Sequence, residues 1–339
     1  MTTKESVKNL WKNCFDDEEA FITLYFEKLY RDELNYVLQK DGKIISALQA
    51  LPYELSYLKG VLSLSYISGA CTTSEYRQQG YMSELLSITH RAEYDKGTEV
   101  CALIPANDSL WEYYRNKGYT TAFFQQTEVY SVASFSKKTD KEYYSFRPLS
   151  SFSDTIYDFI KKQLEKRSCT ILYSLPYLEV VMEDLHLAGG EVLACYRGDR
   201  LAGVAFWINT QQEAAVKELM TEDTETKQIL LQEILRLSGQ SNLTLVAPAI
   251  TDQEPKGMAR VINAEKMLSR YARHFSDQTH FLHIDSDETI PENNGYYIIK
   301  EGQCIRGYSP HYHYTTLSVS QLIQFLFADQ HPFMSLMLE

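Results

Sequence analysis

One turn between a strand and a helix constrains this chain more than any other part of it. Residues 61–67 alternate apolar and polar side chains, the pattern of a half-buried strand, and lead into Gly69. A polar turn over residues 72–79 closes at Gly80, after which apolar residues recur at helical spacing until Gly97 ends the pattern. The sequence therefore predicts a strand, a glycine turn, and a helix that begins directly after the glycine.

The turn has the chemistry of an anion site. A helix N-terminus leaves backbone N–H groups unpaired and carries a partial positive charge, so it binds phosphate well. Gly80 allows the backbone to come close to a ligand, and Arg77 adds a guanidinium that can fork onto phosphate oxygens. A glycine before a helix is more often only a turn, so the turn alone leaves both interpretations open.

A second segment favours a ligand site over a simple turn at Gly80. A short apolar strand at 100–104 precedes Asn107, and Tyr114 follows seven residues later, ahead of Gly118-Tyr119. With the Arg77 loop, this segment resembles the GNAT acetyltransferases. In that family an R/Q-x-x-G-x-G/A loop grips the pyrophosphate of acetyl-CoA, and the later segment supplies an acid for the departing thiol. The resemblance implies that Tyr114 is this acid; Tyr113 is the neighbouring alternative.

The resemblance also implies a cofactor-binding set for acetyl-CoA. The backbone N–H groups of residues 70–72 would hold the thioester carbonyl, and the loop would hold the pyrophosphate. Met82 departs from the general family pattern, which has Gly or Ala at this position. The corresponding loop of the Eis-type (enhanced intracellular survival) acetyltransferases also carries a bulky residue there. The expected residues are Ala70, Cys71, Thr72, Arg77, Gln78, Gln79, Gly80, Tyr81, Met82, Ser83 and Asn107.

Composition limits the partners. The net charge of −12 argues against nucleic acid and mildly favours a cationic substrate, although ordinary cytoplasmic acidity explains it as well. No apolar run approaches the ~18 residues of a membrane span. The six cysteines are scattered without a CxxC pair, which favours a reducing cytoplasm. His311 and His313 lack a nearby third ligand, so no metal is predicted. A homo-oligomer is compatible with the sequence.

The 339 residues suggest about two or three domains of α/β (α+β) class. Residues 1–133 are expected to form the catalytic acetyltransferase domain, ahead of a polar linker over 131–141. Residues 140–250 repeat the order of helices, hairpin, strand, helix and strand. At the corresponding turn, residues 220–225 carry two carboxylates and no glycine, so this second GNAT-like domain is predicted to be non-catalytic.

Residues 256–339 resemble the sterol-carrier-like third domain of the Eis-type acetyltransferases. The chain ends in an apolar run, residues 332–338, where a polar, frayed terminus is usual. In Eis-type enzymes the C-terminal carboxylate enters the active site of the first domain and serves as the base. The resemblance assigns this role to Glu339; the alternative is that the tail only packs as an edge strand.

The expected function is acetyl-CoA-dependent transfer of an acetyl group, by direct attack, to a primary amine of a small cationic or peptide substrate. The alternative is a non-catalytic acyl-CoA or lipid-binding protein. The Arg77 loop together with Tyr114 favours the enzyme, because a pure binder does not need the acid.

Overall fold

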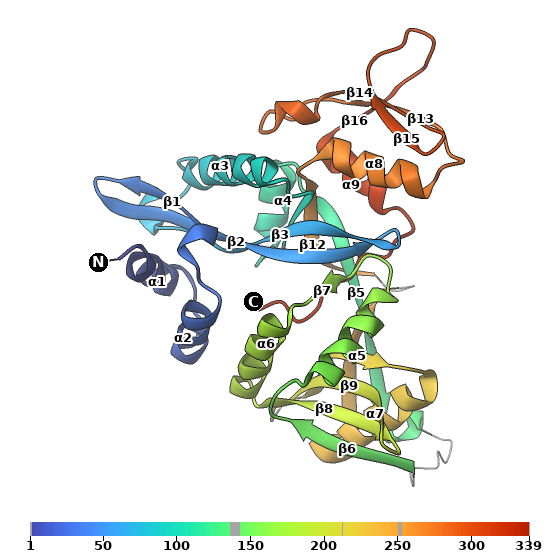
Figure 1. The fold of residues 1–339 in the computed structure, drawn as a ribbon. Helices are drawn as coiled ribbons and strands as arrows, with labels where there is room; N and C mark the ends of the chain where they lie inside the picture. Colours follow the sequence, from blue (N-terminus) through green and yellow to red (C-terminus); the bar gives the residue numbers. More distant parts are fainter. Residues whose placement is uncertain (1, 136–142, 212, 250–252, 339) are drawn as a thin grey trace. The chain divides into compact units, whose positions relative to one another are not determined.

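The computed structural model describes residues 2–135, 143–211, 213–249 and 253–338, coloured by sequence in Figure 1. Within these ranges the chain forms two compact units, the first made of 2–18, 30–123 and 255–332, the second of 19–29, 124–254 and 333–338. The helices are α1 Thr3–Cys14, α2 Glu19–Lys28, α3 Tyr81–Lys96, α4 Asp108–Arg115, α5 Asp154–Glu165, α6 Leu175–Leu187, α7 Thr224–Ser238, α8 Ala264–His274 and α9 Val319–Phe327. The strands are β1 Asn35–Lys40, β2 Lys43–Tyr57, β3 Gly60–Thr72, β4 Val100–Leu103, β5 Thr120–Ser131, β6 Tyr144–Leu149, β7 Ile171–Leu172, β8 Gly190–Arg197, β9 Arg200–Asn209, β10 Ala214–Thr221, β11 Asn242–Pro248, β12 Glu254–Val261, β13 His280–Ile284, β14 Gly295–Lys300, β15 Gln303–Arg306 and β16 Thr315–Leu317.

The main sheet of the first unit has the order β1-β2-β3-β4-β12. The β1–β2 hairpin turns at Asp41 and Gly42, whose φ angles of 51° and 74° are those of a two-residue hairpin turn. β2 and β3 are antiparallel, β3 and β4 are parallel, and β12 runs antiparallel to β4. The sequence pair Asp41-Gly42 predicts this hairpin; the hairpin and the predicted strand, helix and strand that follow it are confirmed, and the α/β class with them.

Helices cover both faces of this sheet. α3 and α4 pack on one face, where Leu85, Leu86 and Tyr114 join Leu48 and Ile67 in a common core. α1 lies on the other face, as Figure 1 shows, and is closed at its start by a capping box between Thr2 and Glu5. The sheet thus separates α1 from α3.

The strand that completes this sheet comes from residues distant in sequence. β12 pairs with β4 over Met258–Val261, and Arg260 on β12 is buried. Its guanidinium donates to Asp287 Oδ1 at 2.5 Å and to the Lys117 carbonyl at 2.8 Å. A Cβ on Gly118 would lie 1.8 Å from the Arg260 Nη1 atom, so a side chain cannot replace this glycine without displacing the buried ion pair.

The first unit also carries a smaller sheet of order β15-β14-β13-β16. Its inner residues Leu282, Ile284, Tyr297 and Ile299 are buried, and α8 packs against β14 and β15. Residues 264–327 therefore form this sheet together with the helices α8 and α9.

The second unit repeats the strand pattern of the first. Its sheet has the order β6-β8-β9-β10-β11-β5, with β10 and β11 parallel and the other neighbours antiparallel. The β8–β9 hairpin, which the sequence predicts within residues 140–250, turns at Gly198, and α7 connects β10 to β11 as α3 connects β3 to β4. Part of the predicted linker, residues 136–141, lies outside the described residues.

The C-terminal segment belongs to the second unit. Phe333 forms a parallel bridge with Thr170, and its N–H donates to the Cys169 carbonyl at 3.0 Å. The Ser335 hydroxyl donates to Glu218 Oε2 at 2.5 Å, and Glu218 also receives two N–H groups of Arg167, at 2.9 and 2.8 Å. The apolar tail is thus held by a bridge and by a buried ion pair. Glu339 itself lies outside the described residues.

Candidate active site

β3 extends beyond the part of it that pairs with β4. Its pairing with β4 is confined to Leu64–Tyr66 opposite Val100–Ala102, so β4 does not pair with the residues that follow Tyr66. The register with β2 also shifts by one residue between the pairs Ala47–Cys71 and Gln49–Ser68. Such a bulge turns backbone N–H groups away from the ladder. Residues 70–72, predicted to hold the thioester by their N–H groups, follow directly.

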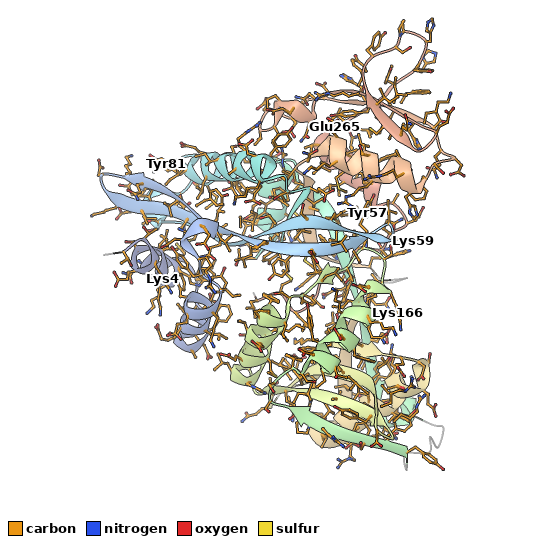
Figure 2. The ribbon with its side chains drawn as sticks, in the orientation of Figure 1. Lys4, Tyr57, Lys59, Tyr81, Lys166 and Glu265 are labelled. Carbon is orange, nitrogen blue, oxygen red and sulfur yellow. The ribbon has the colours of Figure 1, made fainter. Side chains whose placement is uncertain are left out.

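A glycine in the left-handed conformation opens the following helix. Gly80 is the N-cap of α3 with φ of 88°, and among the described residues no side chain caps this helix. A Cβ on Gly80 would meet no atom within 4 Å. Tyr81, labelled in Figure 2 at the start of α3, and the next two residues have amides without a carbonyl one turn earlier in the helix. The turn therefore presents uncapped N–H groups to open space.

Two basic side chains flank this helix end. Arg77 is exposed, and its Nε donates to the Thr72 carbonyl at 3.0 Å, which ties the guanidinium to the end of β3. Lys40, on β1, donates to the Tyr81 hydroxyl at 3.0 Å and lies 5.1 Å from the ring centroid of Tyr76. That hydrogen bond raises the pKa of Lys40, which keeps the ammonium charged. Lys40 is not among the residues predicted from the sequence, because no local pattern links the hairpin to the turn.

The other predicted loop residues have structural partners. Gln78 has φ of 61°, and Gln79 donates from Nε2 to the Glu75 carbonyl at 2.8 Å. The Thr72 hydroxyl lies 2.7 Å from that of Ser46, and Met82 packs against the core between the sheet and α3. The loop is thus braced by its own side chains, which leaves its backbone to face a ligand.

The equivalent turn of the second unit is closed. Asp223 is the N-cap of α7, and its Oδ1 accepts from the Thr226 N–H at 2.8 Å. Arg197 pairs with the same carboxylate at 2.9 Å. A carboxylate therefore occupies the position where a phosphate would meet the helix dipole. This closure explains why the acidic turn over residues 220–225 does not suit a cofactor.

The two candidate acids differ in their surroundings. Tyr114 is buried, with its ring against those of Tyr113 and Tyr119, and burial raises the pKa of its hydroxyl. Among the described residues its hydroxyl has no hydrogen-bond partner. The Tyr113 hydroxyl instead lies 3.2 Å from the Ser83 hydroxyl in the first turn of α3, and burial raises its pKa as well. Tyr113 thus lies beside the loop.

Asn107 starts the helix that carries both tyrosines. Its Oδ1 accepts from the Leu110 N–H at 3.3 Å and from the Ser109 hydroxyl at 2.7 Å, so the side chain is the N-cap of α4. Within the described part of the chain its Nδ2 makes no hydrogen bond and stays available as a donor. Asn107 therefore fixes the start of α4, which sets the position of Tyr114 two turns later.

In the described ranges no helix is long and apolar enough to cross a membrane. The same residues contain no group of three or more His, Cys, Asp or Glu side chains placed to hold a metal ion.

Comparison with known proteins identifies the N-terminal region. Residues 2–122 match the family model of the acetyltransferase (GNAT) domain. No curated protein matches the chain. Among solved structures, a GCN5-related N-acetyltransferase from Anabaena variabilis is similar with a TM-score of 0.78 at 16% identity, covering 96% of this chain and 87% of that one.

Two further structures extend over most of the chain. A conserved protein of unknown function from Enterococcus faecalis, described as a probable N-acyltransferase, gives a TM-score of 0.79 at 16% identity, over 95% of this chain and 87% of that one. Eis1 from Mycobacterium abscessus gives 0.74 at 10% identity, over 96% and 87%. At these identities the similarity shows the fold. Residues 2–122, which contain the open helix end and the end of β3, therefore match a GNAT acetyltransferase domain, and this match supports an acyltransferase.

Proposed function

We propose that the chain transfers an acetyl group from acetyl-CoA to a primary amine of a small cationic or peptide substrate. The observation that carries this proposal is the uncapped N-terminus of α3 at Gly80, together with the end of β3, where pairing with β4 stops at Tyr66. The helix end would bind the pyrophosphate, with Arg77 and Lys40 supplying charge, and backbone N–H groups of residues 70–72 would bind the thioester carbonyl.

The amine must lose a proton before it attacks, because a primary amine with a pKa near 10 is mostly protonated at neutral pH. We assign the base to the C-terminal carboxylate of Glu339, which the resemblance to Eis-type enzymes supplies. A carboxylate has an unperturbed pKa of ~3.5, and apolar surroundings raise it toward the range useful for a base. The apolar residues Met337 and Leu338 precede it directly in sequence.

The attack forms a bond between nitrogen and the acetyl carbon and places negative charge on the carbonyl oxygen. The N–H groups at the bulge of β3 would stabilise this charge. When the intermediate collapses, the C–S bond breaks and the thiolate takes a proton from Tyr114. Burial raises the pKa of the Tyr114 hydroxyl. The same apolar surroundings would raise the pKa of the departing CoA thiol, so a proton could still pass from Tyr114 to the thiolate.

Release of free thiol tests the proposed reaction. Purified full-length protein is incubated with acetyl-CoA and, in separate reactions, with polyamines, aminoglycosides and lysine peptides. Amine-dependent thiol release, with acetylated product seen by mass spectrometry, supports the proposal. Saturable acetyl-CoA binding without release in the presence of any amine would indicate a non-catalytic acyl-CoA binder instead.

Phenylalanine variants separate the two tyrosines. Tyr114→Phe removes the proton donor and keeps the buried ring, so kcat should fall by 10²–10⁴-fold, the usual contribution of an acid, with little change in acetyl-CoA affinity. Tyr113→Phe is the matched control from the adjacent position; it removes the contact with Ser83 and should leave kcat within a few-fold. The reverse ranking would move the acid to Tyr113.

Two C-terminal changes test the base. Glu339→Ala removes the side chain but keeps the chain-terminal carboxylate, so activity should persist. Deleting Leu338 and Glu339 moves the terminus by two residues and should abolish thiol release, while circular dichroism still reports a folded chain. Full activity in the deletion variant would exclude the terminal carboxylate as the base.

We further propose the domain division made from the sequence: a catalytic domain over 1–133, a second GNAT-like domain over 140–250, and a sterol-carrier-like domain over 256–339. The closed α7 turn at Asp223 supports a non-catalytic second domain. The small β13–β16 sheet with α8 and α9 supports a separate role for the third. Calorimetric titration with acetyl-CoA should give one site per chain, and a second site would contradict this assignment.

A further inference from the structure

Two cysteines from distant parts of the sequence meet beside the Arg77 loop. α1 lies across β3 so that the Trp11 ring covers Gly69, where a Cβ would come within 2.1 Å of it. One helical turn after Trp11, Cys14 lies at the end of the same strand, with its Sγ near the carbonyl oxygen of Thr72, the residue after Cys71. The two thiols are neighbours that shift each other's pKa, and both cysteines are free.

Cys14 has the surroundings of a reactive thiol. Its Sγ lies 3.5 Å from the Thr72 carbonyl oxygen, the atom that also receives the Arg77 Nε. The hydrogen bond from the Cys71 thiol and the nearby Arg77 guanidinium together lower the pKa of Cys14 to about 6. The same contact and burial raise the pKa of Cys71, so Cys71 keeps its proton while Cys14 ionises. The side chain of Cys14 is half-buried, which leaves it accessible to a small reagent.

The proposed acetyl transfer uses neither sulfur, since Cys71 would contribute only its backbone. The pair nevertheless combines a thiolate, a neighbouring thiol and a cation, which are the features of an oxidation-sensitive cysteine with a resolving partner.

We propose that Cys14 and Cys71 are a redox modification site that hydrogen peroxide converts to a disulfide. The Cys14 thiolate attacks one peroxide oxygen, the O–O bond breaks, hydroxide leaves, and Cys14 becomes a sulfenic acid. The Cys71 sulfur then attacks the Cys14 sulfur, and the S–O bond breaks. The proton of Cys71 leaves with the departing oxygen as water. The two thiols are oxidised by two electrons and the peroxide is reduced.

Cys304 provides an internal control, because it is also half-buried but has no thiol partner among the described residues, and burial raises its pKa to about 11. At pH 7 its thiolate fraction is about 10⁻⁴, whereas Cys14 is mostly ionised. Allowing for the weaker nucleophilicity of a low-pKa thiolate, iodoacetamide should alkylate Cys14 about 100-fold faster than Cys304. Arg77→Met should slow the alkylation of Cys14 and leave that of Cys304 unchanged.

Peptide mapping tests the disulfide itself. The full chain is treated with stoichiometric hydrogen peroxide, the remaining thiols are alkylated, and the digest should contain one cross-linked peptide joining Cys14 to Cys71, reversed by dithiothreitol. Cys71→Ser should instead leave a sulfenic acid on Cys14 that dimedone traps, and Cys304→Ser should behave as the unmodified chain. Equal alkylation of Cys14 and Cys304, or oxidation of Cys14 without the cross-link, would overturn the proposal. These readouts do not depend on acetyl transfer.

Discussion

Gly80→Ala tests whether the N-terminus of α3 holds the cofactor. With φ of 88°, residue 80 has a backbone conformation that costs an alanine about 1–2 kcal/mol. Part of this cost is offset, because alanine lowers the entropy of the unfolded chain by an equivalent of 0.4–1 kcal/mol. The added Cβ meets no protein atom, so no clash adds to the cost. The free energy of unfolding should therefore fall by only about 1 kcal/mol.

Acetyl-CoA affinity should fall further. The methyl group would enter the open space in front of the first amides of α3, where the pyrophosphate is proposed to lie. Loss of one hydrogen bond from these amides to a charged phosphate costs about 1.5–3 kcal/mol, which corresponds to roughly 10- to 150-fold in Kd. Isothermal titration with acetyl-CoA measures the affinity, and urea unfolding measures the stability.

Gly239→Ala is the matched control. Gly239 closes α7 with φ of 66°, and a Cβ there also meets no atom within 4 Å. The two variants should lose similar stability, while only Gly80→Ala should lose acetyl-CoA affinity. Equal affinities in the two variants would refute the assignment of the pyrophosphate to the α3 terminus.

Two further changes test the cores of the units. Glu218→Gln leaves the partly buried Arg167 without its bidentate partner, which should cost about 3–5 kcal/mol in urea unfolding. Lys28→Met removes one member of an exposed ion pair with Glu183 and should cost under about 1 kcal/mol, and equal losses would contradict the buried role of Glu218. His90 is fully buried against the Tyr119 hydroxyl at 2.8 Å, and burial holds its pKa well below the usual value, so the unfolded chain binds the extra proton. Its share of stability is present above pH ~6.5 and is lost as pH falls, at about 1.4 kcal/mol per pH unit. His90→Gln should therefore flatten the stability profile between pH 6.5 and 5, and an unchanged slope would show that His90 is protonated in the folded chain.

Short-range patterns in the sequence were sufficient for several elements. Asp41-Gly42 predicts the hairpin because few other residue pairs tolerate two positive φ angles, and the structure has both. Gly80 predicts a turn with an open helix end for a similar reason, and the acidic turn before α7 predicts a closed one. These predictions succeed because each depends on the backbone preferences and charges of neighbouring residues.

Contacts between distant residues were decided only by the tertiary structure. Which strand lies beside β3, and where that pairing stops, depends on how the whole sheet closes; β12 completes that sheet from residues 255–261. Lys40 reaches the Arg77 loop only because the β1–β2 hairpin folds toward α3. Cys14 meets Cys71 only because α1 packs across β3.

The sequence by itself thus determined the local scaffold of the proposed cofactor site: the glycine turn, the helix that follows it and the tyrosine two turns into α4. The tertiary structure decided the extent of the β3–β4 pairing, the additional lysine and the thiol pair. The physical reason is the sequence separation over which each interaction acts. Turn conformation and helix capping depend on about four neighbouring residues, whereas strand neighbours are selected by packing across the whole unit.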